Sequence, residues 1–262
     1  MRVRLVGLVL AIGLLVTAGV LWSPRRQRAS YTPLGAGDSY LALGDSLAAG
    51  FTVGDPAEAY VARVATRLRS MNPQLVVKNL AVPGETTTSF QARQLPRAID
   101  FLAAERAAGR RVSPITIDIG GNDARAAERG DRAQRLAAMR QVEANLGRAL
   151  DQLLAATRDR SGRRTADVVV MNYYNPYGGD RADETSPAYW TDQLNQAIAR
   201  AAAARGVPVA DVATPFGGGR AYRYTYITTG DIHANADGHR VIAEQFWKAL
   251  GYPTDTADAT TR

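Results

Sequence analysis

Short apolar runs alternate with longer helix-like stretches along most of the chain. The apolar runs are rich in Val, Ile and Leu, as is typical of strands buried on both faces of a sheet. Alternation of strands and helices predicts a parallel sheet with helices on both faces. The expected strands span residues 40–43, 75–80, 115–119, 167–173 and 207–212, and the expected helices span 57–70, 91–108, 132–157, 187–205 and 235–250.

Polar residues suited to chemistry collect in the segments that follow the expected strands. In an open parallel sheet, ligands bind beyond the carboxyl ends of the strands, so these segments are the places to search. They span 44–55, 81–90, 120–130, 174–187 and 213–234. Four polar clusters lie there: Gly44-Asp45-Ser46, Val82-Pro83-Gly84-Glu85-Thr86, Gly120-Gly121-Asn122-Asp123, and GDIHANADGH at 230–239.

Ser46 stands where the first strand gives way to an alanine-rich stretch, and two roles are open to it. It caps the start of a helix, or it is a nucleophile held at the end of a strand. A nucleophile needs a base within about 2.6–3.2 Å to take its proton. The chain has two histidines. His233 lies in the last loop and is the candidate base, whereas His239 lies inside the final helix and is expected to face elsewhere.

The four clusters, in this order, resemble the four blocks of the GDSL esterases and lipases, also called SGNH hydrolases. The resemblance covers residues 40 to about 250. It rests on Gly44-Asp45-Ser46 for the first block, NLAVPGETT (79–87) with Gly84 for the second, GGND with Gly120 and Asn122 for the third, and HANADGH with His233 for the last.

This resemblance implies an α/β fold, a three-layer α/β/α sandwich with a five-stranded parallel sheet of flavodoxin-like type. It also implies that Ser46 attacks an ester carbonyl while His233 acts as general base and then as general acid. The main-chain N–H groups of Ser46 and Gly84 and the side-chain amide of Asn122 would form the oxyanion hole. An ordinary turn glycine at 84 and a helix-capping asparagine at 122 are the structural alternatives. No metal and no organic cofactor is expected.

The acid of the catalytic triad departs from the family pattern. Family members usually carry an Asp three residues before the histidine and often a Pro after it. Here position 230 is Gly, Asp231 stands two residues before His233, and Ala234 follows. Either Asp231 orients the imidazole, or a backbone carbonyl does and leaves a Ser-His dyad. Asp45 and Asp123 are expected to brace their own loops.

Charge and composition narrow the class of partner. The net charge is +7, but residues 1–29 hold five arginines and no acid, so the remainder carries 27 basic and 25 acidic residues. This near-neutral body does not predict nucleic-acid binding. The absence of cysteine excludes disulfides and thiolate metal sites. Nothing in the sequence specifies an oligomeric state.

The chain is expected to divide into four parts. Arginines followed by an uncharged apolar stretch make residues 1–22 an export signal or a membrane anchor. Residues 23–38 read as a linker, 39–252 as the hydrolase domain, and 253–262 as a tail. The sequence therefore predicts a secreted or membrane-anchored serine esterase or lipase acting on a small-molecule or lipid ester. The alternatives are an acyltransferase acting on cell-envelope sugars and a catalytically silent binding module.

Overall fold

The computed structural model of this chain describes residues 31–217 and 219–253, which belong to one compact unit. The predicted signal or anchor at 1–22 lies outside the described residues. So do positions 23–30 of the predicted linker and positions 254–262 of the predicted tail. Within the described ranges, no helix is long and apolar enough to cross a membrane.

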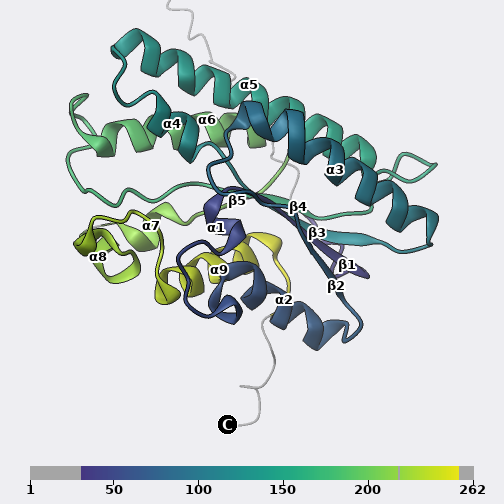
Figure 1. The fold of residues 1–262 in the computed structure, drawn as a ribbon. Helices are drawn as coiled ribbons and strands as arrows, with labels where there is room; N and C mark the ends of the chain where they lie inside the picture. The colour runs from purple at the N-terminus through teal and green to yellow at the C-terminus, as the bar shows by residue number, and fades with distance from the viewer. Residues whose placement is uncertain (1–30, 218, 254–262) are drawn as a thin grey trace, which may run out of the picture. The chain divides into compact units, whose positions relative to one another are not determined.

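The core of the fold is a five-stranded sheet in which every neighbouring pair of strands runs parallel. The strand order is β2-β1-β3-β4-β5, as Figure 1 shows. This order is that of the flavodoxin-like sheets, and it confirms the predicted fold class. The strands are β1 (Ser39–Gly44), β2 (Val76–Asn79), β3 (Val112–Asp118), β4 (Val168–Met171) and β5 (Val209–Ala210).

The burial of a strand explains how closely the apolar pattern predicted its bounds. The central strands β1, β3 and β4 are buried along their whole length, whereas β2 and β5 form the edges and are partly exposed. Strand β3 begins before the predicted strand because Pro114 interrupts the apolar run there. Strand β5 is only two residues long, although six apolar-rich positions were expected to form it. Apolar residues at this edge are buried without pairing as a strand.

Helices cover both faces of the sheet and complete the three-layer sandwich (Figure 1). On one face α5 (Arg132–Ala156) packs between α3 (Thr87–Ala107) and α6 (Pro187–Ala203). On the other face α2 (Tyr60–Met71) packs against α9 (Ala236–Leu250). The helix α3 begins four residues earlier than its apolar pattern predicts, because Thr86 and Ser89 form a capping box.

Short helical turns occupy the segments predicted as loops at the carboxyl edge of the sheet. Their length of one or two turns is too small for an apolar period to show in the sequence. They are α1 (Ser46–Ala49), α4 (Gly121–Ala126), α7 (Ala213–Phe216), α8 (Ala221–Tyr224) and the 3₁₀ turn η2 (Ile227–Thr229). A second 3₁₀ turn, η1 (Pro56–Glu58), instead occupies the start of the helix predicted at 57–70, so that α2 begins at Tyr60.

At the amino edge of the sheet, the described end of the predicted linker is hydrogen-bonded to the domain. The main-chain N–H groups of Leu34 and Gly35 donate to the fully buried carboxylate of Asp167, at 2.9 and 3.0 Å. The hydroxyl of Tyr252 donates to the same carboxylate at 2.8 Å. Asp167 thereby joins the two ends of the described domain.

Candidate active site

Ser46 lies where β1 ends and α1 begins, at the carboxyl edge of the sheet. Asp45 caps the turn, because its side chain accepts the N–H of Leu47 at 3.1 Å. Gly44 is needed just before it: its φ is +145°, and a Cβ atom there would stand 2.2 Å from a carboxylate oxygen of Asp118. The turn therefore presents the serine while Asp45, and not Ser46, provides the helix cap.

His233 meets Ser46 across the site, although 187 residues separate them in the chain. The imidazole Nε2 atom lies 3.0 Å from the serine Oγ, within the reach required of a general base. Two contacts hold the histidine loop: Tyr174 donates its hydroxyl to the carbonyl of Ile232 at 2.9 Å, and the N–H of Tyr226 donates to the carbonyl of His233 at 3.0 Å. His233 is thus held by its backbone as well as by its ring.

Asp231 reaches the other nitrogen of the same ring. Its Oδ1 atom lies 2.5 Å from His233 Nδ1 and also accepts the main-chain N–H of His233 at 2.9 Å. This second bond forms an Asx turn, which allows a spacing of two residues to place the carboxylate beside the ring. Burial raises the pKa of Asp231, but the hydrogen bonds from His233 outweigh it, and the net shift is downward. The group is therefore a stable anion beside the imidazole.

Asn122 and Gly84 come from the two neighbouring loops. The side-chain amide of Asn122 donates to the carbonyl of Glu85 at 3.0 Å, which ties the second and third polar segments together. Gly84 has φ +79°, a conformation that favours glycine. Across the described parts of the chain, neither the main-chain N–H of Ser46 nor that of Gly84 has a hydrogen-bond acceptor. Ser46, Asn122 and His233 line one pocket, and Gly84 does not.

The remaining polar residues of these segments act as braces. Asp45 accepts the hydroxyl of Tyr173 at 2.6 Å, and Asp123 accepts the main-chain N–H and the hydroxyl of Thr87 at 2.8 and 2.6 Å. Neither carboxylate forms a hydrogen bond with His233, because the two ring nitrogens of His233 contact Asp231 and Ser46. Asp45 also braces its own turn through the N–H of Leu47, as expected, whereas Asp123 joins its segment to the start of α3 instead.

His239 is buried away from the site. It is 0% exposed, its Nδ1 atom accepts the N–H of Tyr60 at 3.1 Å, and its ring stacks on the ring of Tyr60. Burial, followed by the charge of Arg63, lowers the pKa of His239 to about 4. A neutral imidazole in this position serves packing, and His233 is left as the candidate base.

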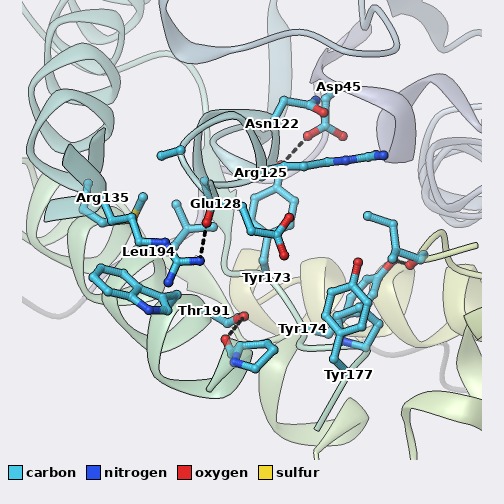
Figure 2. A pocket seen from close by; sticks show the side chains of 18 of the residues that line it. Asp45, Asn122, Arg125, Glu128, Arg135, Tyr173, Tyr174, Tyr177, Thr191 and Leu194 are labelled. Atoms are coloured by element: carbon cyan, nitrogen blue, oxygen red, sulfur yellow. Dashed lines mark hydrogen bonds between the residues drawn. The ribbon is translucent and has the colours of Figure 1, made fainter. Parts of the chain in front are cut away.

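A pocket of about 250 Å³ opens beside Ser46 and extends between α4, α5 and α6. Figure 2 shows Arg135 and Leu194 toward one end of it and Tyr174 and Tyr177 toward the other. The lining is mainly apolar and aromatic: Leu47, Ala124, Ala127, Met139, Tyr173, Tyr174, Pro176, Tyr177, Trp190, Leu194 and Ile232.

The aromatic residues of the two long loops divide between pocket and packing. Tyr174 and Tyr177 line the pocket. Phe216 stacks on Tyr174 with ring centroids 4.3 Å apart, and Tyr224 packs on Phe216 at 5.1 Å. Tyr222 is 61% exposed. These aromatics therefore form part of the pocket wall and part of the loop packing, and Tyr174 does both. No cluster of potential metal ligands occurs in the described part of the chain.

Sequence reasoning missed two groups that shape the site. Tyr173 was assigned only to a strand end, yet its hydroxyl holds Asp45. Asp118 was counted within an apolar strand, yet it contacts the nucleophile turn. A carboxylate inside an otherwise apolar run was the available signal, because aspartate is rarely buried without partners. The pocket residues of α5 and α6, such as Trp190, carry no comparable signal.

Comparison with known proteins agrees with this geometry. The chain matches the GDSL-like Lipase/Acylhydrolase family over residues 42–241. Axe2, an acetylxylan esterase from Geobacillus stearothermophilus, shares the fold with a TM-score of 0.59 and 18% identity, over 85% of this chain and 98% of that chain. LAE5, an alpha/beta hydrolase enzyme from the metagenome of Lake Arreo, Spain, has a TM-score of 0.55 and 19% identity, over 83% and 96%. No curated protein matched.

The family match covers most of the chain and includes all four polar segments that meet at the carboxyl edge of the sheet. At identities below 20%, the solved structures speak for the fold alone. Taken together, these findings show that the chain belongs to the GDSL-like lipase/acylhydrolase family and is a hydrolase of carboxylic esters.

Proposed function

We propose that the protein is an exported serine esterase in which Ser46, His233 and Asp231 form the catalytic triad. The observation that carries this proposal is the unbroken chain of contacts from the serine Oγ to Nε2 (3.0 Å) and from Nδ1 to the carboxylate (2.5 Å). Solved catalytic mutants of Axe2 replace a serine, an aspartate and a histidine. The same three residue types stand together here.

The mechanism follows from the order of these contacts. Ser46 Oγ attacks the ester carbonyl as its proton passes to His233 Nε2, and Asp231 stabilises the imidazolium that forms. The N–H groups of Ser46 and Gly84 and the amide of Asn122 donate to the oxyanion. The tetrahedral intermediate then collapses, and His233 gives its proton to the departing alcohol. Water, deprotonated by the same histidine, hydrolyses the acyl-enzyme and restores Ser46.

The direct test compares the full chain with its Ser46→Ala variant on p-nitrophenyl esters from acetate to palmitate. We expect hydrolysis by the wild type, labelling by a fluorophosphonate probe at Ser46, and loss of both in the variant. Circular dichroism establishes that the variant is folded. A folded wild type that neither hydrolyses an ester nor reacts with the probe would reject the triad and favour a silent binding module.

The pocket supports a specific acyl group, a medium-length apolar chain. A water molecule takes up about 30 Å³ in the liquid, and a methylene group is of similar size. A cavity of about 250 Å³ therefore has room for far more than an acetyl group. Its lining includes the buried side chains of Met139 and Leu194, and its volume suits an acyl chain of about four to eight carbons. We expect kcat/KM to rise about fourfold per methylene up to octanoate, then to fall.

Two adjacent alanines of α4 and its C-terminal cap provide a matched test of the pocket. Ala127 lines it, whereas the neighbouring Ala126 is exposed and does not. Ala127→Trp should lower the octanoate-to-acetate ratio of kcat/KM about tenfold, because the indole fills the space for the chain. Ala126→Trp should leave the ratio unchanged. Equal octanoate-to-acetate ratios in both variants would show that the acyl chain does not bind in this pocket. That result would not affect the assignment of the triad.

Export is the remaining part of the proposal and rests on the apolar segment at 5–22 behind Arg2 and Arg4. Expression of the full chain, followed by fractionation and mass measurement, distinguishes the forms. A shortened chain outside the cytoplasm indicates cleavage, and a full-length chain in the membrane fraction indicates an anchor. A full-length protein confined to the cytoplasm would refute export.

A further inference from the structure

A fully buried aspartate, Asp118, contacts the turn that carries the nucleophile and has no part in the mechanism above. It ends β3 and is 0% exposed. Its Oδ2 atom accepts the main-chain N–H groups of Ala48 at 3.2 Å and Asp45 at 3.4 Å. Its Oδ1 atom lies 2.6 Å from the hydroxyl of Tyr60, on α2. The carboxyl group thus joins the nucleophile turn to the helix layer below it.

The hydrogen bonds of α1 show what this contact achieves. The first N–H groups of any helix lack intrahelical acceptors. Here the N–H of Leu47 donates to the Asp45 side chain, and the N–H of Ala48 donates to the Asp118 side chain. The N–H of the following residue, Ala49, donates to the Asp45 carbonyl. In the described structure, the N–H of Ser46 is the one in this turn without an acceptor. Asp118 therefore completes the turn and leaves free the donor assigned to the oxyanion hole.

The charge of this carboxyl group matters because a second one lies beside it. Asp45 is 2% exposed, and no arginine, lysine or histidine of the described chain donates to Asp118 or pairs with it. The surrounding titratable groups are Asp45 on the turn, the phenols of Tyr40, Tyr60, Tyr173 and Tyr174, and, beyond them, His233 and His239.

Burial, followed by the negative charge of Asp45, raises the pKa of Asp118 well above its ordinary value. Burial raises the pKa of Asp45 too, but hydrogen bonds, including those from Tyr173 and Leu47, oppose that shift. The proton of the pair accordingly resides on Asp118. A neutral carboxyl group still accepts the N–H bonds of the turn, and it adds no second negative charge near the developing oxyanion.

We propose that Asp118 is a positioning residue whose buried carboxyl group holds the Ser46 turn in its reactive geometry. The proposal rests on Ser46 being the nucleophile. Asp118 does not touch the substrate; it acts through the main chain of Asp45 and Ala48. Its removal should therefore slow the chemical step and leave substrate binding almost unchanged.

Two variants of the full chain separate shape from charge. Asp118→Leu removes the acceptor, and we expect kcat for p-nitrophenyl butyrate to fall about 10²-fold, as for small misplacements of a reacting group, with KM nearly constant. Asp118→Asn keeps an acceptor oxygen, and we expect kcat within about fivefold of wild type near neutral pH. Asp167→Leu, a buried aspartate at the opposite edge, is the matched control. Rates are expressed per active site titrated with the fluorophosphonate probe.

The pH dependence of kcat separates the two roles, because a general loss of stability would not change it. As pH rises through the pKa of Asp118, the wild-type carboxyl ionises beside Asp45, and kcat should fall. An amide cannot ionise, so Asp118→Asn should keep its kcat over the pH range in which the wild type loses it. This comparison needs only the isosteric variant and stands even where Asp118→Leu does not fold.

Each outcome decides the matter. The proposal is supported by a kcat loss in Asp118→Leu that Asp167→Leu does not share, provided that Asp118→Asn also lacks the wild-type fall of kcat with rising pH. It is overturned by wild-type kcat per titrated site in Asp118→Leu, or by a fall of kcat with rising pH that is the same in Asp118→Asn as in the wild type. A wild type that reacts with neither ester nor probe overturns the proposed function. A wild type that reacts with both, combined with an unaffected Asp118→Leu, overturns only the positioning role of Asp118.

Discussion

Two buried aspartates lie at opposite edges of the same sheet and have different partners. Asp167 precedes β4 at the amino edge, and Asp118 ends β3 at the carboxyl edge. Both are 0% exposed. Asp167 accepts main-chain N–H groups from residues 34 and 35, binds Tyr252, and lies 3.5 Å from the guanidinium of Arg164. Asp118 accepts N–H groups from the nucleophile turn and has no cation partner in the described chain.

This difference follows from the topology of a parallel sheet. Every strand presents its carboxyl end at one edge, so the loops that follow the strands converge there, whereas the amino edge collects the segments that precede them. A buried acid at the amino edge therefore stabilises the closure of the domain, whereas we propose that the buried acid at the carboxyl edge supports the reacting groups.

The largest effect should come from the base itself. His233→Ala removes the group that takes the serine proton, and we expect kcat to fall by about 10⁴-fold or more. Because the side chain lies at the site and not in the core, the midpoint of urea unfolding should change little. His239→Asn, in the buried second histidine, is the control and should keep its activity. Comparable losses in the two variants would argue against His233 as the base.

Asp231→Asn tests the acid at its unusual spacing. An amide in place of the carboxylate no longer stabilises the imidazolium, and we expect kcat to fall about 10²–10⁴-fold with KM little changed. Steady-state kinetics on p-nitrophenyl butyrate measures both constants. If turnover stays within a few-fold of wild type, Asp231 is not the triad acid and a Ser46–His233 dyad is the better description.

Asn122→Ala removes one of the three proposed oxyanion donors. The expected loss is about 10²–10³-fold in kcat, which corresponds to about 2.7–4 kcal/mol of transition-state stabilisation. Asp123→Asn, next in the sequence, is a useful comparison because its carboxylate contacts Thr87 and not the reacting groups. A loss in Asn122→Ala no larger than that in Asp123→Asn would reduce Asn122 to a loop brace.

Replacing the buried aspartate at the amino edge of the sheet by asparagine should affect stability and not activity. Asp167→Asn weakens the bonds to residues 34 and 35 and the ion pair with Arg164, at an expected cost of about 3 kcal/mol in the free energy of unfolding. Urea unfolding measures that loss, and kcat per titrated active site should equal that of the wild type. A clear reduction in kcat would show that the two edges are coupled.

The smallest effect concerns the pH dependence of stability. Burial lowers the pKa of His239 to about 4, so between pH 6.5 and pH 4 the unfolded chain binds more protons than the folded one. The free energy of unfolding should therefore fall by about 2 kcal/mol between pH 7 and pH 4.5 on account of this residue. His239→Asn, whose side-chain oxygen still accepts the Tyr60 N–H, should lack that part of the dependence. Identical pH dependence in both proteins would contradict a neutral buried imidazole.

The sequence by itself determined the layers of the fold and the list of candidate reacting residues. Val-, Ile- and Leu-rich runs separated by long helices admit one kind of sheet, and such a sheet gathers the loops with Ser46, Asn122 and His233 at one edge. Two histidines in the chain left few choices of base. These are local properties, legible in spacing and residue type, and the central strands and long helices were predicted accordingly.

Only the tertiary structure decided how those residues act on one another. The hydroxyl of Tyr173 on Asp45 and the carboxyl of Asp118 on the main chain of Ala48 join groups far apart in the sequence, so their spacing does not predict their distance. Asp231 is near His233 in the sequence, but only the Asx turn shows that its carboxylate reaches the imidazole. The pocket depends on Trp190 and Leu194, which read in sequence as ordinary buried helix positions. Packing converts such positions into a site, because the shape of a cavity depends on every element around it at once.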